Sequence, residues 1–201
     1  METSSQSQSL ILQPARRNFI VTGAAALFAA TASGRALAQF GPEGKLDVPY
    51  VPTPMPVVQK MLEMGEVTKD DLLYDLGCGD GRIVSTAAKE RGARGVGIDL
   101  DPDRIKEAQA YAKTQGVTDR VKFMQADLFK SDFSPATVVT LYLLDSVNQR
   151  LRPQLWKQLK VGTRVVSHDF SMGSQWPPER TERIGNSTIY RWTITEEHKR
   201  A

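Results

Sequence analysis

An apolar segment that runs directly into a glycine-rich turn is the strongest constraint on how this chain folds. Residues 71–76 read as a strand and are followed by Gly77-Cys78-Gly79-Asp80-Gly81-Arg82, with glycines at alternate positions. Glycine has no side chain, so the backbone here turns sharply and lets a ligand approach, and the helix expected from residue 82 offers free N–H groups. The pattern predicts a strand–turn–helix unit. By itself it also fits a tight connection that binds nothing.

The rest of the chain continues this alternation. Hydrophobic periodicity predicts helices at 57–67, 82–91 and 104–115, and one between 145 and 160 that is interrupted near Pro153. Strands are predicted at 71–76, 95–100, 121–124, 136–144 and 163–170, before a hairpin of 181–184 and 187–194. Repeated strand–helix units with short turns imply one α/β domain, residues 54–201. Its sheet is expected to have seven strands, mostly parallel, with a C-terminal antiparallel hairpin.

Two acids follow the next strands at informative positions. Asp99 ends the second strand, 22 residues after Gly77. An acid about 20 residues after such a turn accepts hydrogen bonds from ribose hydroxyls. Asp127 follows the third strand, where a carboxylate accepts from an adenine amino group. Each acid alone fits a solvated loop or a helix cap. The three features in register favour a nucleoside site.

The spacing of the turn also separates two cofactors. A dinucleotide loop runs G-x-G-x-x-G and holds a pyrophosphate. Here the third glycine comes one residue earlier, and Asp75 opens the motif. A carboxylate there repels a diphosphate and suits a cation. S-adenosylmethionine has an ammonium, a sulfonium, a ribose and an adenine, but no phosphate. The rival class is a nicotinamide-dependent oxidoreductase, which Asp75 and Asp80 disfavour.

Charge and cysteine content exclude other partners. The formal net charge of +3 falls to 23 basic against 22 acidic residues beyond the first 38 residues. No basic run with interleaved aromatic residues follows, so we expect no nucleic-acid partner. A single cysteine excludes a disulfide framework and a thiolate zinc cluster, and we expect no metal.

Residues 1–38 have the composition of an export signal. Arg16-Arg17 precede an apolar stretch at 19–32, and Ala36-Leu37-Ala38 supply an A-x-A cleavage site. Paired arginines are typical of a twin-arginine signal, which predicts an exported, periplasmic protein. An uncleaved membrane anchor or a mitochondrial transit peptide would have a similar composition. Residues 39–53, rich in proline and glycine, form a linker and a candidate lid.

The glycine loop with Gly97-Ile98-Asp99 and Asp127-Leu128 resembles class I S-adenosylmethionine-dependent methyltransferases, which have a Rossmann-like fold. A closer resemblance is to the lysine methyltransferases that modify the adenine nucleotide translocase and the ATP synthase c subunit in mitochondria, and to their bacterial relatives. This sequence departs from the mitochondrial members at residues 140–144 and 167–169. The motifs that carry the closer resemblance are 49–54, 79–84, Asp127-Leu128-Phe129, Asp132-Phe133, Phe170 and Trp176-Pro177-Pro178.

The resemblance implies which residues hold S-adenosylmethionine. Its methionine end would lie at the glycine loop, its ribose at Asp99 and its adenine at Asp127. The segment before the first helix would fold over the cofactor as a lid, although its prolines fit a fixed linker equally well. The cofactor-binding residues expected in this way are Tyr50, Thr53, Asp75, Gly77, Gly79, Gly81, Asp99 and Asp127.

The resemblance also implies a protein lysine, on a membrane-associated substrate, as methyl acceptor. Lysine has a pKa of about 10.4, so deprotonating it near pH 7.4 costs roughly 4 kcal/mol, and a nearby acceptor must assist. Tyr142, His168 and Asp169 are the polar groups expected at the ends of the fourth and fifth strands, where such sheets bind ligands. Each also fits a satisfied, buried polar side chain.

Other hypotheses stay open from the sequence. Trp176 fits a core residue or part of an alkylammonium cage, and Cys78 fits a small packing residue because no base stands beside it. A small-molecule methyltransferase and a non-catalytic module that binds S-adenosylmethionine are the alternative functions.

Overall fold

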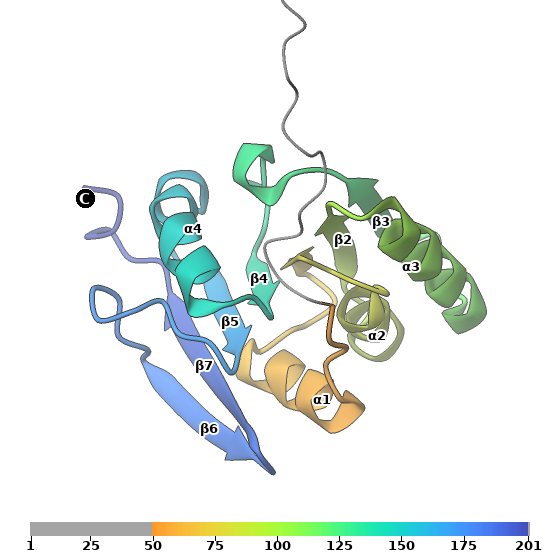
Figure 1. Ribbon diagram of the computed structural model, residues 1–201, viewed down its shortest axis with the longest axis horizontal. Helices are drawn as coiled ribbons and strands as arrows, with labels where there is room; N and C mark the ends of the chain where they lie inside the picture. Colours follow the sequence, from red (N-terminus) through yellow and green to blue (C-terminus); the bar gives the residue numbers. More distant parts are fainter. Residues whose placement is uncertain (1–49, 201) are drawn as a thin grey trace, which may run out of the picture. The chain divides into compact units, whose positions relative to one another are not determined.

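The computed structural model describes residues 50–200 (Figure 1). The predicted export signal and the linker up to residue 49 lie outside the described residues. The elements are α1 (Met55–Met64), β1 (Leu72–Leu76), α2 (Arg82–Arg91), β2 (Arg94–Asp99), α3 (Pro102–Gln115), β3 (Val121–Gln125), the 3-10 turn η1 (Leu128–Lys130), β4 (Val138–Leu141), α4 (Asp145–Gln158), β5 (Arg164–His168), β6 (Arg180–Ile184) and β7 (Ser187–Thr193).

The strands form one seven-stranded sheet in the order β3-β2-β1-β4-β5-β7-β6. Neighbours from β3 to β5 pair in parallel, and β7 pairs antiparallel with both β5 and β6. The order reverses at β1, whose next neighbours are β2 on one side and β4 on the other. Ligands of open α/β sheets bind at such a switch point, beyond the carboxyl ends of the strands. The predicted fold, a mostly parallel sheet with a C-terminal hairpin, is confirmed.

Helices cover both faces of the sheet (Figure 1). Successive strand residues point to opposite faces, so Leu73 packs with α1 and α2 while Tyr74 packs with α4. On β4, Val138 likewise packs on the side of α1 and α2, and Val139 on the side of α4. Ala88 of α2 packs with Ala112 of α3, so α3 shares the α1–α2 side. These two cores fix the strand ends that carry the site.

Several predicted boundaries are wrong. The first helix spans Met55–Met64 rather than 57–67, and the fifth strand ends at His168 rather than at residue 170. Helix α4 is continuous through Pro153, because this proline faces solvent while Leu151 and Leu155 keep the buried face intact. The fourth strand ends at Leu141 rather than at residue 144, since its last pair is Leu76 with Leu141 and β1 then turns away. Tyr142 therefore lies in the loop that follows the strand.

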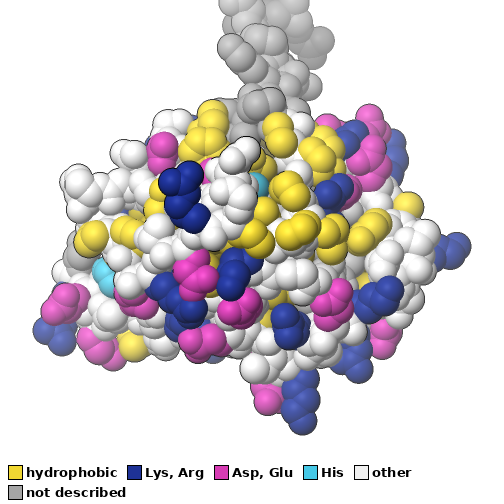
Figure 2. All heavy atoms as spheres, turned by 90° about the horizontal axis from the view of Figure 1, so that it is seen from below, with side chains coloured by type: hydrophobic (Ala, Val, Ile, Leu, Met, Phe, Trp, Pro, Cys, Tyr) yellow, Lys and Arg dark blue, Asp and Glu magenta, His cyan; other side chains and the backbone are white. Residues whose placement is uncertain are grey.

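The described surface carries mixed charge. In Figure 2, positive and negative side chains are interspersed, and hydrophobic side chains form a broken band across this face. Between residues 50 and 200, no helix combines the length and the apolar character needed to cross a bilayer.

Candidate cofactor pocket and active site

The glycine loop between β1 and α2 has left-handed backbone at each of its three glycines. The φ angles are +82° at Gly77, +52° at Gly79 and +72° at Gly81. The N–H groups of Gly77 and Cys78 both donate to the carbonyl oxygen of Ile98, at 2.8 and 3.0 Å. These bonds fix the loop to the end of β2. Only glycine adopts this conformation without strain, so the sequence pattern encodes the turn directly.

The three glycines do different things. Gly77 and Gly79 line a pocket at the carboxyl ends of the strands, whereas Gly81 does not. A Cβ atom on Gly81 would lie 2.6 Å from the Phe123 ring and 2.8 Å from Ala108 Cβ, and Gly81 is the N-cap of α2. Gly81 therefore lets α2 pack against α3 and β3. This packing role needs no ligand. The spacing of the glycines alone did not distinguish Gly81 from Gly77 and Gly79, which line the pocket.

Asp99 holds the loop from the opposite side. Its Oδ2 accepts a hydrogen bond of 2.8 Å from the N–H of Gly79, and its Oδ1 accepts one of 3.0 Å from the N–H of Asp101. Asp101 in turn caps α3 by accepting from the N–H of Asp103. The Asp99 carboxylate lines the pocket in a fixed orientation, with lone pairs left for a ligand.

Asp75 is the most perturbed acid of the pocket. It is 2% exposed, and Thr140 on β4 donates a hydrogen bond of 2.7 Å to its Oδ1. Burial raises its pKa to about 7, and the nearby carboxylates of Asp99 and Asp80 add to the shift. A cation placed against Asp75 would favour its ionised form.

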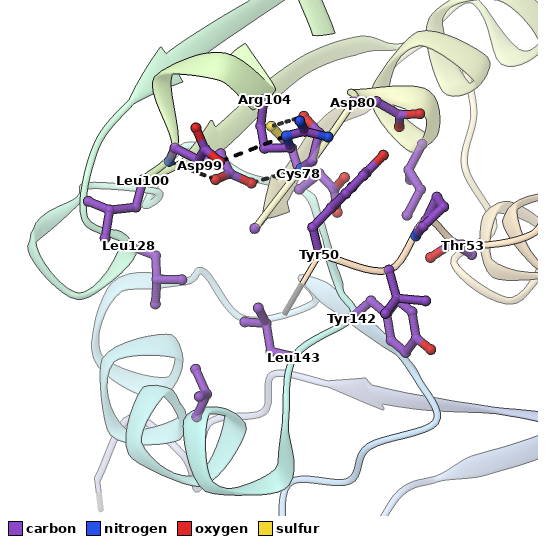
Figure 3. A pocket seen from close by; sticks show the side chains of 18 of the residues that line it. Tyr50, Thr53, Cys78, Asp80, Asp99, Leu100, Arg104, Leu128, Tyr142 and Leu143 are labelled. Carbon is purple, nitrogen blue, oxygen red and sulfur yellow. Dashed lines mark hydrogen bonds and ion pairs between the residues drawn. The ribbon is translucent and has the colours of Figure 1, made fainter. Parts of the chain in front are cut away.

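The residues before α1 form one wall of the pocket (Figure 3). The Tyr50 ring rests on the loop, since a Cβ atom on Gly79 would lie 2.4 Å from Tyr50 Cε2. The guanidinium of Arg104 lies 4.5 Å from the centre of the Tyr50 ring. Arg82 donates a hydrogen bond of 3.0 Å to the Thr53 carbonyl oxygen and pairs with Asp80.

Sequence reasoning missed the role of Arg82 and Arg104. The Arg82–Asp80 pair joins two residues of the glycine motif itself, so both partners were in view in the sequence. The contact of Arg104 with Tyr50 had no sequence signal, because 54 residues separate them.

Asp127 lines the pocket and directly precedes Leu128, which lies on the opposite side of the pocket from Thr53 in Figure 3. Its Oδ1 accepts a hydrogen bond of 2.9 Å from the N–H of Phe129 and caps η1. Beside it, Ala126, Leu128 and Phe129 supply an apolar wall. In Figure 3, Asp99, Leu100 and Leu128 stand on one side of the pocket, and Thr53 and Tyr142 on the other. The pocket thus has two chemically different ends.

Of the three residues predicted to be catalytic, only Tyr142 lines the pocket. Burial, and then the charge of Asp169, raise the pKa of its hydroxyl. His168 is 1% exposed and lies behind it, with ring centres 3.8 Å apart. Asp169 lies 3.2 Å from His168 Nε2 and accepts a hydrogen bond of 2.7 Å from the N–H of Thr188. His168 and Asp169 therefore reach the pocket only through other side chains.

Two further residues have packing roles. Cys78 is buried, which raises the pKa of its thiol, and a Cβ atom on Gly97 would lie 2.8 Å from its Sγ. Trp176 is 4% exposed, packs in the α4-side core, and lies 5.7 Å from Trp192 between ring centres. Trp176 is thus a core residue and not part of an open cage. No cluster with three metal-ligating side chains occurs among residues 50–200.

The pocket is large and acidic. The space between its walls, including the part open to solvent, is ≈ 990 Å³. Two arginines offset part of the acidic charge, since Arg82 pairs with Asp80 and Arg104 lies 3.8 Å from Asp101. The acids that line the pocket are Asp75, Asp80, Asp99, Asp101 and Asp127. The surplus of carboxylates suits a cationic nucleoside and repels a diphosphate.

Comparison with known proteins gives the family. A family model described as an ANTKMT methyltransferase domain matches residues 75–180, the segment from Asp75 to the start of β6. The chain belongs to this family. It is an S-adenosylmethionine-dependent methyltransferase with the Rossmann-like fold of that class, as the glycine loop and Asp99 predicted.

Three relatives illustrate the likeness. The methyltransferase is 48% identical over 157 residues to "Protein-lysine N-methyltransferase" of Saccharolobus islandicus, which covers 76% of this chain and 96% of that protein. It is 33% identical over 153 residues to "Adenine nucleotide translocase lysine N-methyltransferase" of Mus musculus, covering 75% of this chain and 65% of the mouse protein. The crystal structure of an RNA methyltransferase from Salinibacter ruber with S-adenosyl-L-homocysteine matches with a TM-score of 0.71 and 62% identity, covering 73% of this chain and 95% of that one.

The pocket fits S-adenosylmethionine. Asp75 is a buried carboxylate with a raised pKa, which a cationic ligand would satisfy. Asp99 is oriented at the mouth of the loop, and an apolar wall beside Asp127 suits a purine ring. A volume of several hundred cubic ångströms is typical of pockets for ligands of this size.

Proposed function

We propose that this methyltransferase transfers a methyl group to the side-chain amine of a protein lysine. The observation that carries the proposal is the 48% identity to a protein-lysine methyltransferase along 96% of that relative. The match is not limited to the cofactor half, because it spans far more than the glycine loop and Asp99. The neutral hydroxyl groups at the Thr53–Tyr142 end of the pocket are compatible with an amine acceptor.

In this proposal the strand ends hold the cofactor, which supplies a methyl group on a positively charged sulfur. Asp75 and the loop at Gly77 and Gly79 bind the methionine end. Asp99 accepts hydrogen bonds from the ribose, and Asp127 binds the adenine. Gly81 acts indirectly by setting the start of α2. Tyr50 and Thr53 cover the cofactor, held in place by Arg82. Alignment of the reacting groups does much of the work in methyl transfer.

The acceptor enters at the opposite end. Tyr142 contacts it, and its hydroxyl keeps its proton at neutral pH because its pKa is raised. Tyr142 therefore orients the amine by hydrogen bonding and does not act as a base. His168 and Asp169 support the Tyr142 ring and the Thr53 wall from behind.

RNA is the second candidate acceptor, favoured by the name of the Salinibacter ruber protein. Against it stands the nearly neutral charge of residues beyond 38, since phosphate contacts need a surplus of Lys and Arg. The interspersed charges of Figure 2 support the same choice. A small molecule is the third candidate.

Isotope-labelled S-adenosylmethionine separates these acceptors. The full-length protein is incubated with membrane, soluble-protein, RNA and small-molecule fractions of the source cells, and labelled products are identified by mass spectrometry. We expect label on lysine Nε. Label only on RNA, on a small molecule or on oxygen would exclude the lysine proposal but keep the methyltransferase. The Asp99→Ala protein serves as the negative control.

We further propose a membrane-associated acceptor. Three of the large hydrophobic side chains that stay exposed, Tyr50, Val51 and Leu100, line the pocket. This apolar rim supports an acceptor lysine that is presented beside apolar residues. The membrane fraction should then carry most of the label. Label confined to soluble proteins would contradict this.

We also propose export through a twin-arginine pathway, supported by Arg16-Arg17, the apolar stretch and the A-x-A site. The mature N-terminus is then Gln39, on the far side of the inner membrane. Changing both arginines to lysine should retain the precursor in the cytoplasm. N-terminal sequencing decides the matter: an intact Met1 on a cytoplasmic protein would exclude export, and a full-length protein in the membrane would indicate an uncleaved anchor.

A further inference from the structure

A chain of polar side chains leads from the pocket wall to the far edge of the parallel sheet. Thr53 lines the pocket, and its Oγ1 lies 3.3 Å from His168 Nδ1. On the other side of the imidazole, Nε2 lies 2.8 Å from Ser187 Oγ and 3.2 Å from Asp169 Oδ2. Thr53 and His168 are almost fully buried, whereas the Asp169 side chain is 32% exposed. The path therefore connects the pocket with a carboxylate that water reaches.

The chemistry of these groups sets the direction of the hydrogen bonds. The carboxylate of Asp169 lies 3.2 Å from Nε2, and its negative charge favours the tautomer that carries the proton on Nε2, from where the ring donates to Ser187 Oγ at 2.8 Å. In the neutral ring, Nδ1 is then an acceptor, and the Thr53 hydroxyl donates to it. The Thr53 oxygen is left with lone pairs that can accept a proton from a ligand. Burial lowers the pKa of His168, and Asp169 offsets part of that shift, so the ring is neutral and able to take up a proton.

We propose that Thr53, His168 and Asp169 form a proton relay that deprotonates the acceptor amine inside the pocket. The inference rests on the proposed function, because a lysine enters as an ammonium. One N–H bond of the ammonium breaks and its proton passes to Thr53 Oγ1, while the proton of Thr53 passes to His168 Nδ1. The Nε2 proton moves to Asp169 Oδ2 and from there to water. The amine keeps the electron pair, and nothing is oxidised or reduced.

The surrounding charges favour this path. Tyr142, whose ring packs against His168, holds its own proton because its pKa is raised. Arg82 bonds to the Thr53 carbonyl oxygen and is balanced by Asp80. Lys60 of α1 and Glu182 of β6 pair with each other. Asp169, whose carboxylate lies 3.2 Å from Nε2, thus stabilises the transient imidazolium by its charge.

The first test needs no acceptor. The chain has two histidines, so His198→Gln leaves His168 as the sole imidazole for long-range ¹H–¹⁵N NMR. At about pH 7, we expect a neutral ring with the proton on Nε2 and an Nδ1 signal that shifts when Thr53→Val removes its hydrogen bond. A proton on Nδ1, or a cationic ring, would overturn the relay.

The second test is the pH dependence of a single turnover. The enzyme is in excess over the acceptor in the cell fraction whose lysine it labels. Thr53→Val keeps the shape of threonine but has no hydroxyl, and we expect it to be about 10- to 100-fold slower near pH 7.5. The difference should shrink as the pH rises toward and above about 10.4, where most of the lysine enters already neutral. Thr53→Ser should stay within about 3-fold of the parent at both pH values.

Matched variants separate the relay from packing. Asp169 has φ +60°, which asparagine tolerates, and Asp169→Asn keeps an oxygen for the Thr188 N–H. It should be slower near pH 7.5 and recover at high pH like Thr53→Val. The control is Thr114→Val, at an exposed position of α3, and its single-turnover rate should match that of the parent. Affinity for S-adenosylhomocysteine, by calorimetry, should be unchanged in Asp169→Asn and Thr114→Val, which change residues outside the pocket lining.

Each outcome is decisive. A deficit of Thr53→Val that is equal at all pH values, or absent, would overturn the relay and leave lysine methylation standing. A parent enzyme that labels no lysine would overturn the proposed function, and the relay with it.

Discussion

At the Asp99 end of the pocket, the polar groups are main-chain N–H groups and carboxylates fixed by them, as in the bond from Gly79 to Asp99. At the Thr53 end, the walls are the side chains of Thr53 and Tyr142, with His168 and Ser187 packed behind them. The first end is built by local geometry within two neighbouring strand–helix units. The second depends on elements that are far apart in the chain. The first therefore suits a fixed cofactor, and the second can change with the acceptor.

The largest expected effect tests whether the loop is set by backbone geometry. Gly81→Ala should lower the free energy of unfolding by about 2–4 kcal/mol, because it combines left-handed strain with a clash against Phe123 and Ala108. Gly116→Ala is the control, since Gly116 has φ +71° but nothing within 4 Å of its added Cβ. It should cost only about 1–2 kcal/mol. Urea unfolding measures both, and equal losses would refute the packing role.

Asp99→Ala tests the cofactor end directly. It removes a carboxylate that accepts from the loop and would accept from a ribose, so affinity for S-adenosylhomocysteine should fall by about 1–3 kcal/mol. NAD should not bind measurably to the parent or the variant. Asp103→Ala, an exposed acid in the first turn of α3, is the control and should bind like the parent. Titration calorimetry that finds equal affinity for the parent and Asp99→Ala would remove Asp99 from the site.

The raised pKa of Asp75, about 7, predicts opposite pH effects on binding and stability. The cation S-adenosylmethionine favours the ionised carboxylate, so its affinity should rise roughly tenfold per pH unit up to about pH 7 and then level off. Without ligand, the folded state holds the proton more tightly than the unfolded state. Stability should therefore fall as the pH rises from about 4 to 7 and stay level above.

Asp75→Asn keeps the acceptor for Thr140 but carries no charge. Calorimetry and thermal unfolding at several pH values should show that this variant loses the Asp75 contribution to both pH dependences. Unchanged profiles in the variant would show that another group titrates.

The smallest expected effect concerns the hydroxyl group of Tyr142 at the acceptor end. Tyr142→Phe keeps the ring that stacks on His168 and loses only the hydroxyl, so the single-turnover rate should fall about 3- to 10-fold. Affinity for S-adenosylhomocysteine should be unchanged, because Tyr142 lies away from the Asp99 end. If affinity fell and the rate did not, Tyr142 would belong to the cofactor end instead.

The sequence by itself determined the strand–turn–helix units, the glycine loop and the position of Asp99. These depend on local quantities: hydrophobic period, positive φ at glycine, and a separation of 20 residues between Gly79 and Asp99 that one strand–helix unit spans. The same local signals missed the continuity of α4 through Pro153, because they do not tell which face of a helix meets solvent.

Only the tertiary structure decided the different roles of the three glycines and the arrangement of the acceptor end. Gly81 faces Phe123 and Ala108, which lie on other elements, so the spacing within the motif does not indicate that contact. The contact of Thr53 with His168 joins residues 115 positions apart. It forms because the segment before α1 lies beside the end of β5. Contacts of this kind follow from strand order and packing of whole elements, and a single sequence does not specify them locally.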